Sequence, residues 1–301
     1  MSTNTAILLL AHGTPESVDQ IPEYLSKVTG GRAIPQSVID EVSHRFSLIG
    51  SSPLTRLTME QVHLLAESIS MPVYAGMRNW KPYIADVVAK MRKDGIEKIV
   101  AICLAPQNSR TSVGLYRRAV FAATEGMQVE FIEGWADHPQ LIAAFAGRLQ
   151  AAWYPSPETG VIFTAHSVPE RTVQASDEAG PDPYADEAQR TAKLVAEQVG
   201  LTPDQWTFAF QSQGMSGGPW LGPTVEDTLT ALHQRGIRKV IVQPIGFLCD
   251  HVEILYDIDI GFRDYARNLG MKLTRPESLN NSPLLTAALA DLAHKGLERL
   301  P

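Results

Sequence analysis

The sequence predicts an α/β protein with two similar doubly wound, Rossmann-like halves, each with a parallel sheet flanked by helices. Stretches with helix and strand character alternate along the chain, as they do where crossover helices join parallel strands. A strand that runs into AHGTP at Ala11–Pro15 is matched by one that runs into AHSVP at Ala165–Pro169. GIEKIV at Gly95–Val100 is matched, in the same order, by GIRKVI at Gly236–Ile241. We therefore expect duplicated halves that face each other, with strand ends lining a shared cleft.

The length of 301 residues suggests two domains, which we expect at residues 1–150 and 151–301, with the last helix packing back on the first domain. Hydrophobic residues make up 44% of the chain, which is enough for a sizeable core. The net charge of −7 argues against nucleic acid as a partner, because phosphates attract basic surfaces.

The two cysteines, Cys103 and Cys249, are too far apart for a CxxC pair and too few for a four-cysteine cluster. This usage fits a reducing cytoplasm. The apolar run at residues 6–11 is too short for a signal peptide, and no run approaches the roughly 18 residues of a membrane span. We expect a cytoplasmic protein with at most peripheral membrane contact.

In the first half, apolar runs that stop at turn residues predict strands. These runs occupy residues 6–11, 73–77 and 98–105. Amphipathic stretches bounded by Pro, Gly or Ser predict the helices between them. These stretches occupy residues 17–28, 35–48, 58–70 and 83–93.

The second half restarts the pattern. Its predicted strands occupy residues 160–165, 207–211, 240–242 and 272–274. Its predicted helices occupy residues 186–199, 224–235 and 283–300. Residues 175–184 and 214–223 are rich in Gly and Pro and predict loops.

The stretch 240–259 changes character abruptly after its strand. If the later part is helical, Asp250, Glu253 and Asp257 share one face. Like charges at that spacing repel by roughly 0.2–0.5 kcal/mol per pair, which a cation, a shared proton or an open aqueous cleft could relieve. The alternative is that acids simply favour the first turn of a helix, which would cover Asp250 and Glu253 but not Asp257.

His166 ends the first strand of the second half, and the acidic stretch follows a later strand of that half. Because parallel strands end at one edge of a sheet, we expect His166 and Glu253 to face each other. An imidazole with carboxylates suits Fe(II), Co(II) or Zn(II), whereas an all-oxygen set would suit Mg(II) or Ca(II). The alternative is a histidine that only stabilises its turn by a hydrogen bond to a loop carbonyl, and the same holds for His12 in the matching turn.

The stretch 106–118, PQNSRTSVGLYRR, combines hydroxyl groups with basic residues. Ser109, Ser112 and Tyr116 lie close in sequence to three arginines, and the group could hydrogen-bond the anionic groups of a ligand. The alternative is an ordinary exposed helix start. No GxxxxGK[ST] or GxGxxG phosphate loop, no GxSxG elbow and no HExxH motif occurs.

Further motifs are spread along the whole chain. They are LLLAHGTPE at 8–16, SSPLTRLT at 51–58, AGMRNWKP at 75–82, LAPQNS at 104–109, FTAHSVP at 163–169, DPY at 182–184, PWLGP at 219–223 and GFLCDHVEILYDID at 246–259. In this order they resemble the motifs of the ferrochelatases, which insert Fe(II) into a porphyrin in haem synthesis. FTAHSVP and GFLCDHVEILYDID are the most specific of them.

The resemblance implies roles for individual residues. His166 is similar to the family's metal-site histidine, and Glu253 to its partner carboxylate, so both would be catalytic and would bind the metal. Asp257 resembles part of an acidic line that leads from the site, and would act as a relay. The implied substrate-binding residues are His12, Arg45, Ser52, Arg78, Ser109, Ser112, Tyr116 and Trp220.

Departures from the family pattern concern metal delivery and the substrate branch. Where many members carry another carboxylate, this chain has Gly261, so the acidic line is incomplete. Many coproporphyrin-using members read AYGTP, and their tyrosine can touch the product iron, which His12 could do here through nitrogen. The segment 30–52 lacks the long apolar lip of membrane-associated members. The lack of this lip resembles the branch that uses coproporphyrin III, with protoporphyrin IX left open.

The resemblance implies a chelatase-like fold and a lyase that forms nitrogen–metal bonds, with porphyrin and ferrous iron as substrates and two protons released. It implies no prosthetic group, no iron–sulfur cluster, a monomer, and a downstream haem-pathway enzyme as a partner for the product. A cobalt or nickel chelatase of another tetrapyrrole, and a non-catalytic tetrapyrrole carrier of the same fold, are the alternatives. Trp220, Trp80, Tyr116 and Phe247 could present aromatic surface to the ring.

Overall fold

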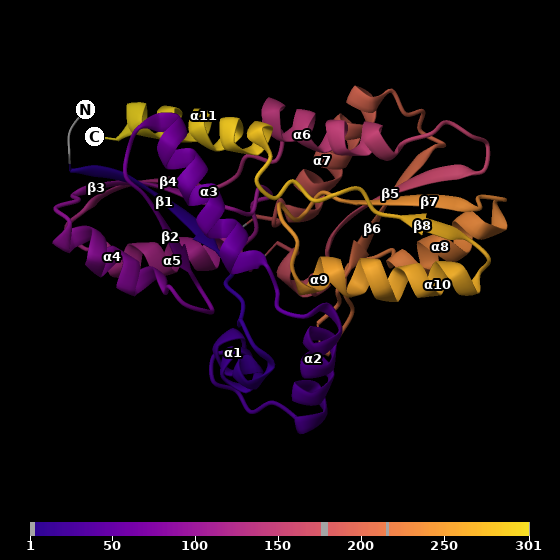
Figure 1. Ribbon diagram of the computed structural model, residues 1–301, viewed down its shortest axis with the longest axis horizontal. Helices are drawn as coiled ribbons and strands as arrows, with labels where there is room; N and C mark the ends of the chain where they lie inside the picture. The colour runs from indigo at the N-terminus through magenta and orange to yellow at the C-terminus, as the bar shows by residue number, and fades with distance from the viewer. Residues whose placement is uncertain (1–3, 176–179, 215–216, 301) are drawn as a thin grey trace.

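The computed structural model describes residues 4–175, 180–214 and 217–300 of the chain. Within these residues the strands form two parallel four-stranded sheets, which lie side by side in Figure 1. The first sheet has the order β2-β1-β3-β4 and the second the order β6-β5-β7-β8. The strands are β1 (Thr5–Ala11), β2 (Val73–Met77), β3 (Lys98–Cys103), β4 (Gln128–Ile132), β5 (Thr159–His166), β6 (Trp206–Gln211), β7 (Lys239–Pro244) and β8 (Lys272–Thr274). The predicted fold class is confirmed.

The two sheets repeat one topology, since adding four to each strand number of the first order gives the second. The inner strand β1 is buried along its whole length, and β5 is buried up to its last residue, His166. A strand covered on both faces needs a continuous apolar run, which is why β1 reads TAILLLA. In register, Leu9 pairs with Ile102 of β3, and Phe163 pairs with Phe208 of β6.

Helices cover both faces of each sheet (Figure 1). The α-helices are α1 (Ile21–Val28), α2 (Gln36–Ile49), α3 (Leu54–Ile69), α4 (Ile84–Lys93), α5 (Val113–Ala123), α6 (Pro139–Ala152), α7 (Tyr184–Val199), α8 (Val225–Gln234), α9 (Val252–Leu255), α10 (Arg263–Asn268) and α11 (Pro283–Arg299). Short 3-10 helices are η1 (Val18–Gln20) and η2 (Glu170–Thr172), and η3 (Asp257–Phe262) is a π-helix. The last helix, α11, contacts α3, α6, β3 and β4.

One hydrophobic core joins the two halves. Ile7 and Ile102 of the first sheet, Phe163 and Ile241 of the second, and Leu289 of α11 belong to a single cluster of buried side chains. Because this core is continuous, we expect the two sheets to move little relative to each other.

The helices α1 and α2 form a hairpin that stands apart from both sheets in Figure 1. It has a small core of its own, in which Ile21 and Leu25 of α1 pack against Phe46 of α2. Val252 at the start of α9 packs against the same cluster. The hairpin, which belongs to the first half by sequence, therefore also rests on the second half.

Several elements differ from the sequence-based expectation. The stretch from 105 to 159 also contains α5, β4 and α6, none of which the patterns predicted. β4 is an edge strand with only its last residue buried, so its apolar run is short. α6 buries Leu141, Ile142, Phe145 and Leu149 at helical spacing, so the sequence does carry the signal of this helix and the prediction missed it.

The expected shared face of Asp250 with Glu253 and Asp257 is wrong. The backbone up to His251 is not helical, α9 starts only at Val252, and the π-helix η3 follows from Asp257. Asp250 instead lies 3.1 Å from the Arg275 guanidinium, which also pairs with Asp259. The charge at this position is thus neutralised away from the acidic pair that follows it.

The predicted loops 175–184 and 214–223 lie partly outside the described residues, at 176–179 and 215–216. Of the helices that the structure describes, none combines the length and the apolar character that crossing a membrane requires.

Candidate active site

A cavity of about 400 Å³ lies between the halves, at the carboxyl ends of the strands. His12 follows β1, Arg78 follows β2 and His166 ends β5, so both sheets contribute to the wall. This volume is typical of small-molecule sites. The lining is mainly apolar, with Leu54, Leu104, Val168, Phe247, Leu248 and Val252 among its residues.

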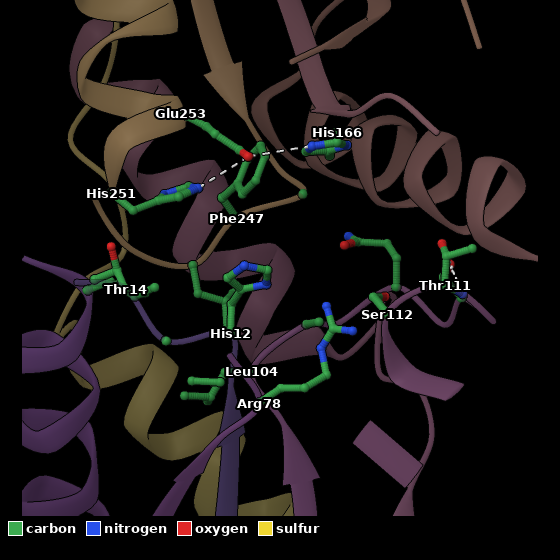
Figure 2. Close-up of a pocket in the computed structure, with 18 of the residues that line it drawn as sticks. His12, Thr14, Arg78, Leu104, Thr111, Ser112, His166, Phe247, His251 and Glu253 are labelled. Atoms are coloured by element: carbon green, nitrogen blue, oxygen red, sulfur yellow. Dashed lines mark hydrogen bonds and ion pairs between the residues drawn. The ribbon is translucent and has the colours of Figure 1, made fainter. Parts of the chain in front are cut away.

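Two histidines flank one carboxylate on the wall of the second half (Figure 2). Nε2 of His166 lies 3.5 Å from Oε1 of Glu253, and Nε2 of His251 lies 3.5 Å from Oε2 of the same side chain. Gly246 makes this approach possible, because a Cβ there would lie 2.8 Å from the Cβ of Ala165. The turn after β7 can therefore pass against the end of β5.

The other ring nitrogen of each histidine contacts a backbone carbonyl. Nδ1 of His166 contacts the carbonyl oxygen of Ser167, and Nδ1 of His251 lies 3.1 Å from that of Cys249. A carbonyl only accepts hydrogen bonds, so both Nδ1 atoms carry hydrogen. The two Nε2 atoms are therefore the positions that can take up a proton or bind a metal. His166 can therefore stabilise its turn through Nδ1 and act in a site through Nε2 at the same time.

The two central groups have strongly perturbed pKa values. Burial lowers the pKa of His166, but the charge of Glu253 and a hydrogen bond to it prevail, and the net pKa is raised. Burial favours a neutral carboxyl, yet the charge and hydrogen bonds of His166 and His251 hold the pKa of Glu253 well below its ordinary value. Both shifts favour the ion pair of imidazolium and carboxylate, so the imidazole of His166 is more basic than a free one.

His12 lies on the opposite wall of the cavity (Figure 2). Its Nε2 is 3.0 Å from the hydroxyl of Tyr24 and 3.1 Å from the amide nitrogen of Asn79. Burial, and then the charge of Arg78, lower the pKa of His12 to about 4, so the ring is neutral at pH 7. The turn requires Gly13, whose φ is +82° and where a Cβ would lie 2.9 Å from Trp80.

Arg78 supplies a positive charge to the cavity. Its guanidinium carbon lies 5.7 Å from the centre of the Tyr116 ring, and its buried Nε has no hydrogen-bond partner. Among the described residues no acidic side chain forms an ion pair with it, which is unusual for a largely buried cation. The cavity is therefore prepared for an anionic group of a ligand.

Hydroxyl groups gather at one end of the cavity beside Arg78. Ser109, Thr111 and Ser112 line the wall there, and Oγ of Ser109 lies 2.9 Å from Oγ1 of Thr111. Figure 2 places Thr14 at the other end, with His12 and Phe247 between them. The hydroxyl cluster that the sequence predicted thus faces the cavity.

The predicted site residues divide into two groups. Those that line the cavity are His12, Arg78, Ser109, Ser112, Tyr116, His166, Trp220 and Glu253. Arg45, Ser52 and Asp257 are absent from its lining. Of the aromatic residues, Phe247 also lines it, whereas Trp80 packs edge-on against Tyr24 at 6.2 Å.

Arg45 binds behind the cavity wall. Its guanidinium lies over the Tyr256 ring at 4.9 Å and 3.4 Å from Asp257, which also accepts a hydrogen bond from Ser212. Burial raises the pKa of Asp257 to about 6, and Glu253 adds to the shift. Ser52 is buried, and its hydroxyl has no partner in the described part of the chain.

Sequence reasoning did not select His251, Tyr24 or Tyr184 as site residues. His251 lies two positions before Glu253, and on a helix this spacing would point the two side chains in different directions. The backbone at His251 is extended instead, which lets its ring reach the Glu253 carboxylate. Tyr184 lines the cavity from the first turn of α7, and a single contact of this kind leaves no periodic signal. The signal for Tyr184 was its place in the DPY motif.

Metal-binding capacity is limited in the free protein. The described residues contain no group of three or more His, Cys, Asp or Glu side chains arranged to hold an ion. His166 and Glu253 therefore offer an incoming ion only part of a coordination shell, and a ligand in the cavity would have to complete it.

Comparison with known proteins gives one consistent result. Residues 4–297 match the ferrochelatase family model. A ferrochelatase from Acidobacterium capsulatum is 66% identical, covering 100% of this chain and 97% of its own, and a coproporphyrin III ferrochelatase from Bacillus subtilis is 33% identical, covering 97% and 98%. A solved structure of the sirohydrochlorin chelatase SirB from Bacillus subtilis, with cobalt, has a TM-score of 0.58 at 13% identity, covering 98% of this chain and 96% of that chain. That likeness shows a shared fold.

Proposed function

Because the chain belongs to the ferrochelatase family, whose members insert iron into a porphyrin in haem synthesis, we propose that its porphyrin substrate is coproporphyrin III. Coproporphyrin III carries four propionates, whereas protoporphyrin IX carries two propionates and two apolar vinyl groups. The distribution of polar groups around the cavity favours the first of them.

The observation that carries this proposal is the polar character of both ends of the cavity. Arg78 and the hydroxyls of Thr111 and Ser112 lie at one end, and Thr14 lies at the other (Figure 2). Hydroxyl and guanidinium groups hydrogen-bond carboxylates, whereas a vinyl group gains nothing from them. The names of relatives at 32–34% identity, coproporphyrin III ferrochelatase, support the same substrate.

The apolar lining suits the faces of the macrocycle. Leu104 lies on the wall of the first half and Phe247 on that of the second, and Trp220 and Tyr116 add aromatic surface. A flat ring held between such walls loses its water, which strengthens every polar contact at its edge.

We assign the proton transfer to the second-half wall. The ring must lose two pyrrole protons as iron enters. The raised pKa of His166 makes Nε2 a good acceptor once it is neutral, and Glu253 lies 3.5 Å away to accept in turn. His251 on the other side of Glu253 gives a second acceptor, which matches the two protons to be removed.

Iron is a substrate in this scheme and meets the same atoms. Nε2 of His166 and an oxygen of Glu253 would bind Fe(II) while the pyrrole nitrogens replace its other ligands, and Nε2 would accept a pyrrole proton only after it has released the iron, because its one lone pair cannot do both at once. Asp257 would act as a relay behind Glu253 rather than as a ligand in the cavity. His12 would face the opposite side of the ring, where its neutral nitrogen could meet the iron of the product.

The wider expectations remain part of the proposal. We propose that the protein works as a monomer in the cytoplasm, without a resident prosthetic group or iron–sulfur cluster. We also propose that it passes its product to a downstream enzyme of haem synthesis.

The test is anaerobic turnover of Fe(II) with coproporphyrin III and with protoporphyrin IX, at equal concentrations and followed by the loss of porphyrin fluorescence. We expect kcat/KM to be about tenfold or more higher for coproporphyrin III, because one extra charge-assisted hydrogen bond contributes about 1.5 kcal/mol or more. An equal or higher value for protoporphyrin IX would overturn the substrate assignment.

A further inference from the structure

The DPY motif, Asp182–Tyr184, stands at the start of α7 and lies between two parts of the cavity wall. The proposed function gives it no role. Its neighbours are the hydroxyl-bearing loop of residues 107–112 from the first half and the end of β5 in the second.

Asp182 is almost completely buried and joins the two halves. Its Oδ2 accepts a hydrogen bond of 2.7 Å from the backbone N–H of Arg110 and lies 3.3 Å from Nε of the same residue. Its Oδ1 accepts a 3.0 Å bond from the backbone N–H of Tyr184, at the start of α7. Only 1% of its side chain is exposed, so this carboxylate binds groups of the protein and does not contact ligand or solvent.

Neighbouring residues of the loop are held by the second half in the same way. The backbone N–H of Asn108 donates a 2.6 Å bond to Glu187 of α7. The side-chain amide of Gln107 donates to Thr191 of α7 and to the carbonyl of Ile245, both at 3.2 Å. Positions 107, 108 and 110 thus bind the second half.

The hydroxyl-bearing positions of the same loop face the cavity, which Gln107 also lines. Ser109, Thr111 and Ser112 line it, beside Arg78. The loop therefore has two sides, one fixed to α7 and the other offering hydroxyls to the ligand. The positions of these hydroxyls therefore depend on the hydrogen bonds that fix the loop to the second half.

The third residue of the motif reaches the proton-accepting pair. The Tyr184 hydroxyl donates a 2.8 Å hydrogen bond to the carbonyl of His166. Burial raises the pKa of Tyr184, so the hydroxyl keeps its proton at neutral pH. One short segment thus contacts both the backbone of His166 and the loop that faces the edge of the ring.

We propose that Asp182 is a positioning residue for porphyrin binding, which sets the place of the 109–112 hydroxyls relative to His166 and acts through the loop rather than by touching the ligand. This inference rests on the proposed function, because it takes the loop to bind the carboxylates of a porphyrin. Two N–H groups, one from each half, share the carboxylate of Asp182, so this side chain helps to set the spacing of the halves at this end of the cavity, together with the bonds of Gln107 and Asn108.

The test is Asp182→Asn in the full chain, with porphyrin affinity measured by fluorescence in the absence of iron and turnover measured separately. In asparagine an NH2 group replaces one of the two carboxylate oxygens, so the bond to the N–H of either Arg110 or Tyr184 is lost. We expect the Kd and KM for coproporphyrin III to rise at least about 5-fold, and by less than the roughly 10- to 150-fold that direct loss of a hydrogen bond to a charged group would cause, because the ligand keeps its own partners in the displaced loop. We expect kcat at saturation to stay within about threefold, because His166 and Glu253 are unchanged.

Thr224→Ala is the matched control. Thr224 caps α8 in the same half by accepting a 3.1 Å bond from the N–H of Asp227, and it is absent from the cavity lining. Both variants should lose thermal stability, but only Asp182→Asn should lose affinity. Equal affinities of Asp182→Asn and the wild type, or an equal loss in Thr224→Ala, would overturn the inference.

A double-mutant cycle with Ser112→Ala tests whether Asp182 acts through the loop. If it does, the loss of affinity in the double variant stays clearly below the product of the two single losses. Fully multiplicative losses would contradict a role through the loop. Failure of the proposed function is recognised separately, since the wild-type protein would then neither bind coproporphyrin III nor insert iron into it.

Discussion

Arg78 gives the sharpest prediction on substrate binding, because it faces the cavity with a charge that no acidic side chain of the described chain pairs with. In Arg78→Met the stem is kept and the guanidinium is lost. At about 4 Å and an effective dielectric of about 20, a guanidinium and a propionate attract by about 4 kcal/mol before desolvation. A charge-assisted hydrogen bond retains about 1.5–3 kcal/mol of net gain. We therefore expect the Kd for coproporphyrin III to rise about 10- to 150-fold.

The same substitution should not weaken the fold. Loss of the unpartnered Nε of Arg78 should offset loss of the contact between the guanidinium and Tyr116, so the free energy of unfolding should change by no more than about 1 kcal/mol. The assays are porphyrin fluorescence for Kd and urea denaturation for stability. Arg117→Met is the control, because Arg117 pairs with Glu133 at 3.3 Å outside the cavity lining. Unchanged affinity in Arg78→Met, or a clear loss of stability, would refute the reasoning.

Three further predictions concern the cavity walls. His251→Gln removes the second proton acceptor and should lower kcat for iron insertion about 10- to 100-fold with little change in KM, measured anaerobically; an unchanged kcat would exclude that role. The pKa of His12 is about 4 in the folded protein and about 6.5 in the unfolded chain, so the unfolded state binds more protons between these values and stability falls as the pH drops from 6.5 to 4. His12→Gln should remove about 2 kcal/mol of this loss at pH 5, measured by urea denaturation at pH 7 and pH 5. The same pH dependence in the variant and the wild type would contradict this prediction. Gly13→Ala forces a Cβ to within 2.9 Å of Trp80 at a φ of +82°, so unfolding free energy should fall by about 1–3 kcal/mol or more, and a wild-type urea midpoint would refute this.

Sequence reasoning predicted the fold and the central pair because both follow from strand ends. His166 and Glu253 come after strands of one parallel sheet, and such strands end at a common edge, so their meeting needed no tertiary information. The buried inner strands also read directly as apolar runs, as β1 does. The hydroxyls of Ser109 and Ser112 were found because they cluster in sequence.

The failures at Asp250 and Arg45 have a common physical cause, which is tertiary packing that leaves no periodic trace. Asp250 was expected to share a face with Glu253, but the backbone before Val252 is extended and a π-helix follows. Arg45 lies on the hairpin of α1 and α2, and only the contact of that hairpin with α9 decides that its guanidinium meets Asp257 behind the cavity.

The claim on which the account depends is that the imidazole of His166, beside Glu253, accepts a pyrrole proton as iron enters. The most direct measurement is the rate of anaerobic iron insertion by His166→Ala, together with its Kd for coproporphyrin III. The substitution leaves the His166 carbonyl that Tyr184 binds, so the fold and the affinity should be kept. We predict turnover about 100-fold or more below wild type with a Kd within a few-fold. Near-normal turnover by this variant would contradict the assignment of the site.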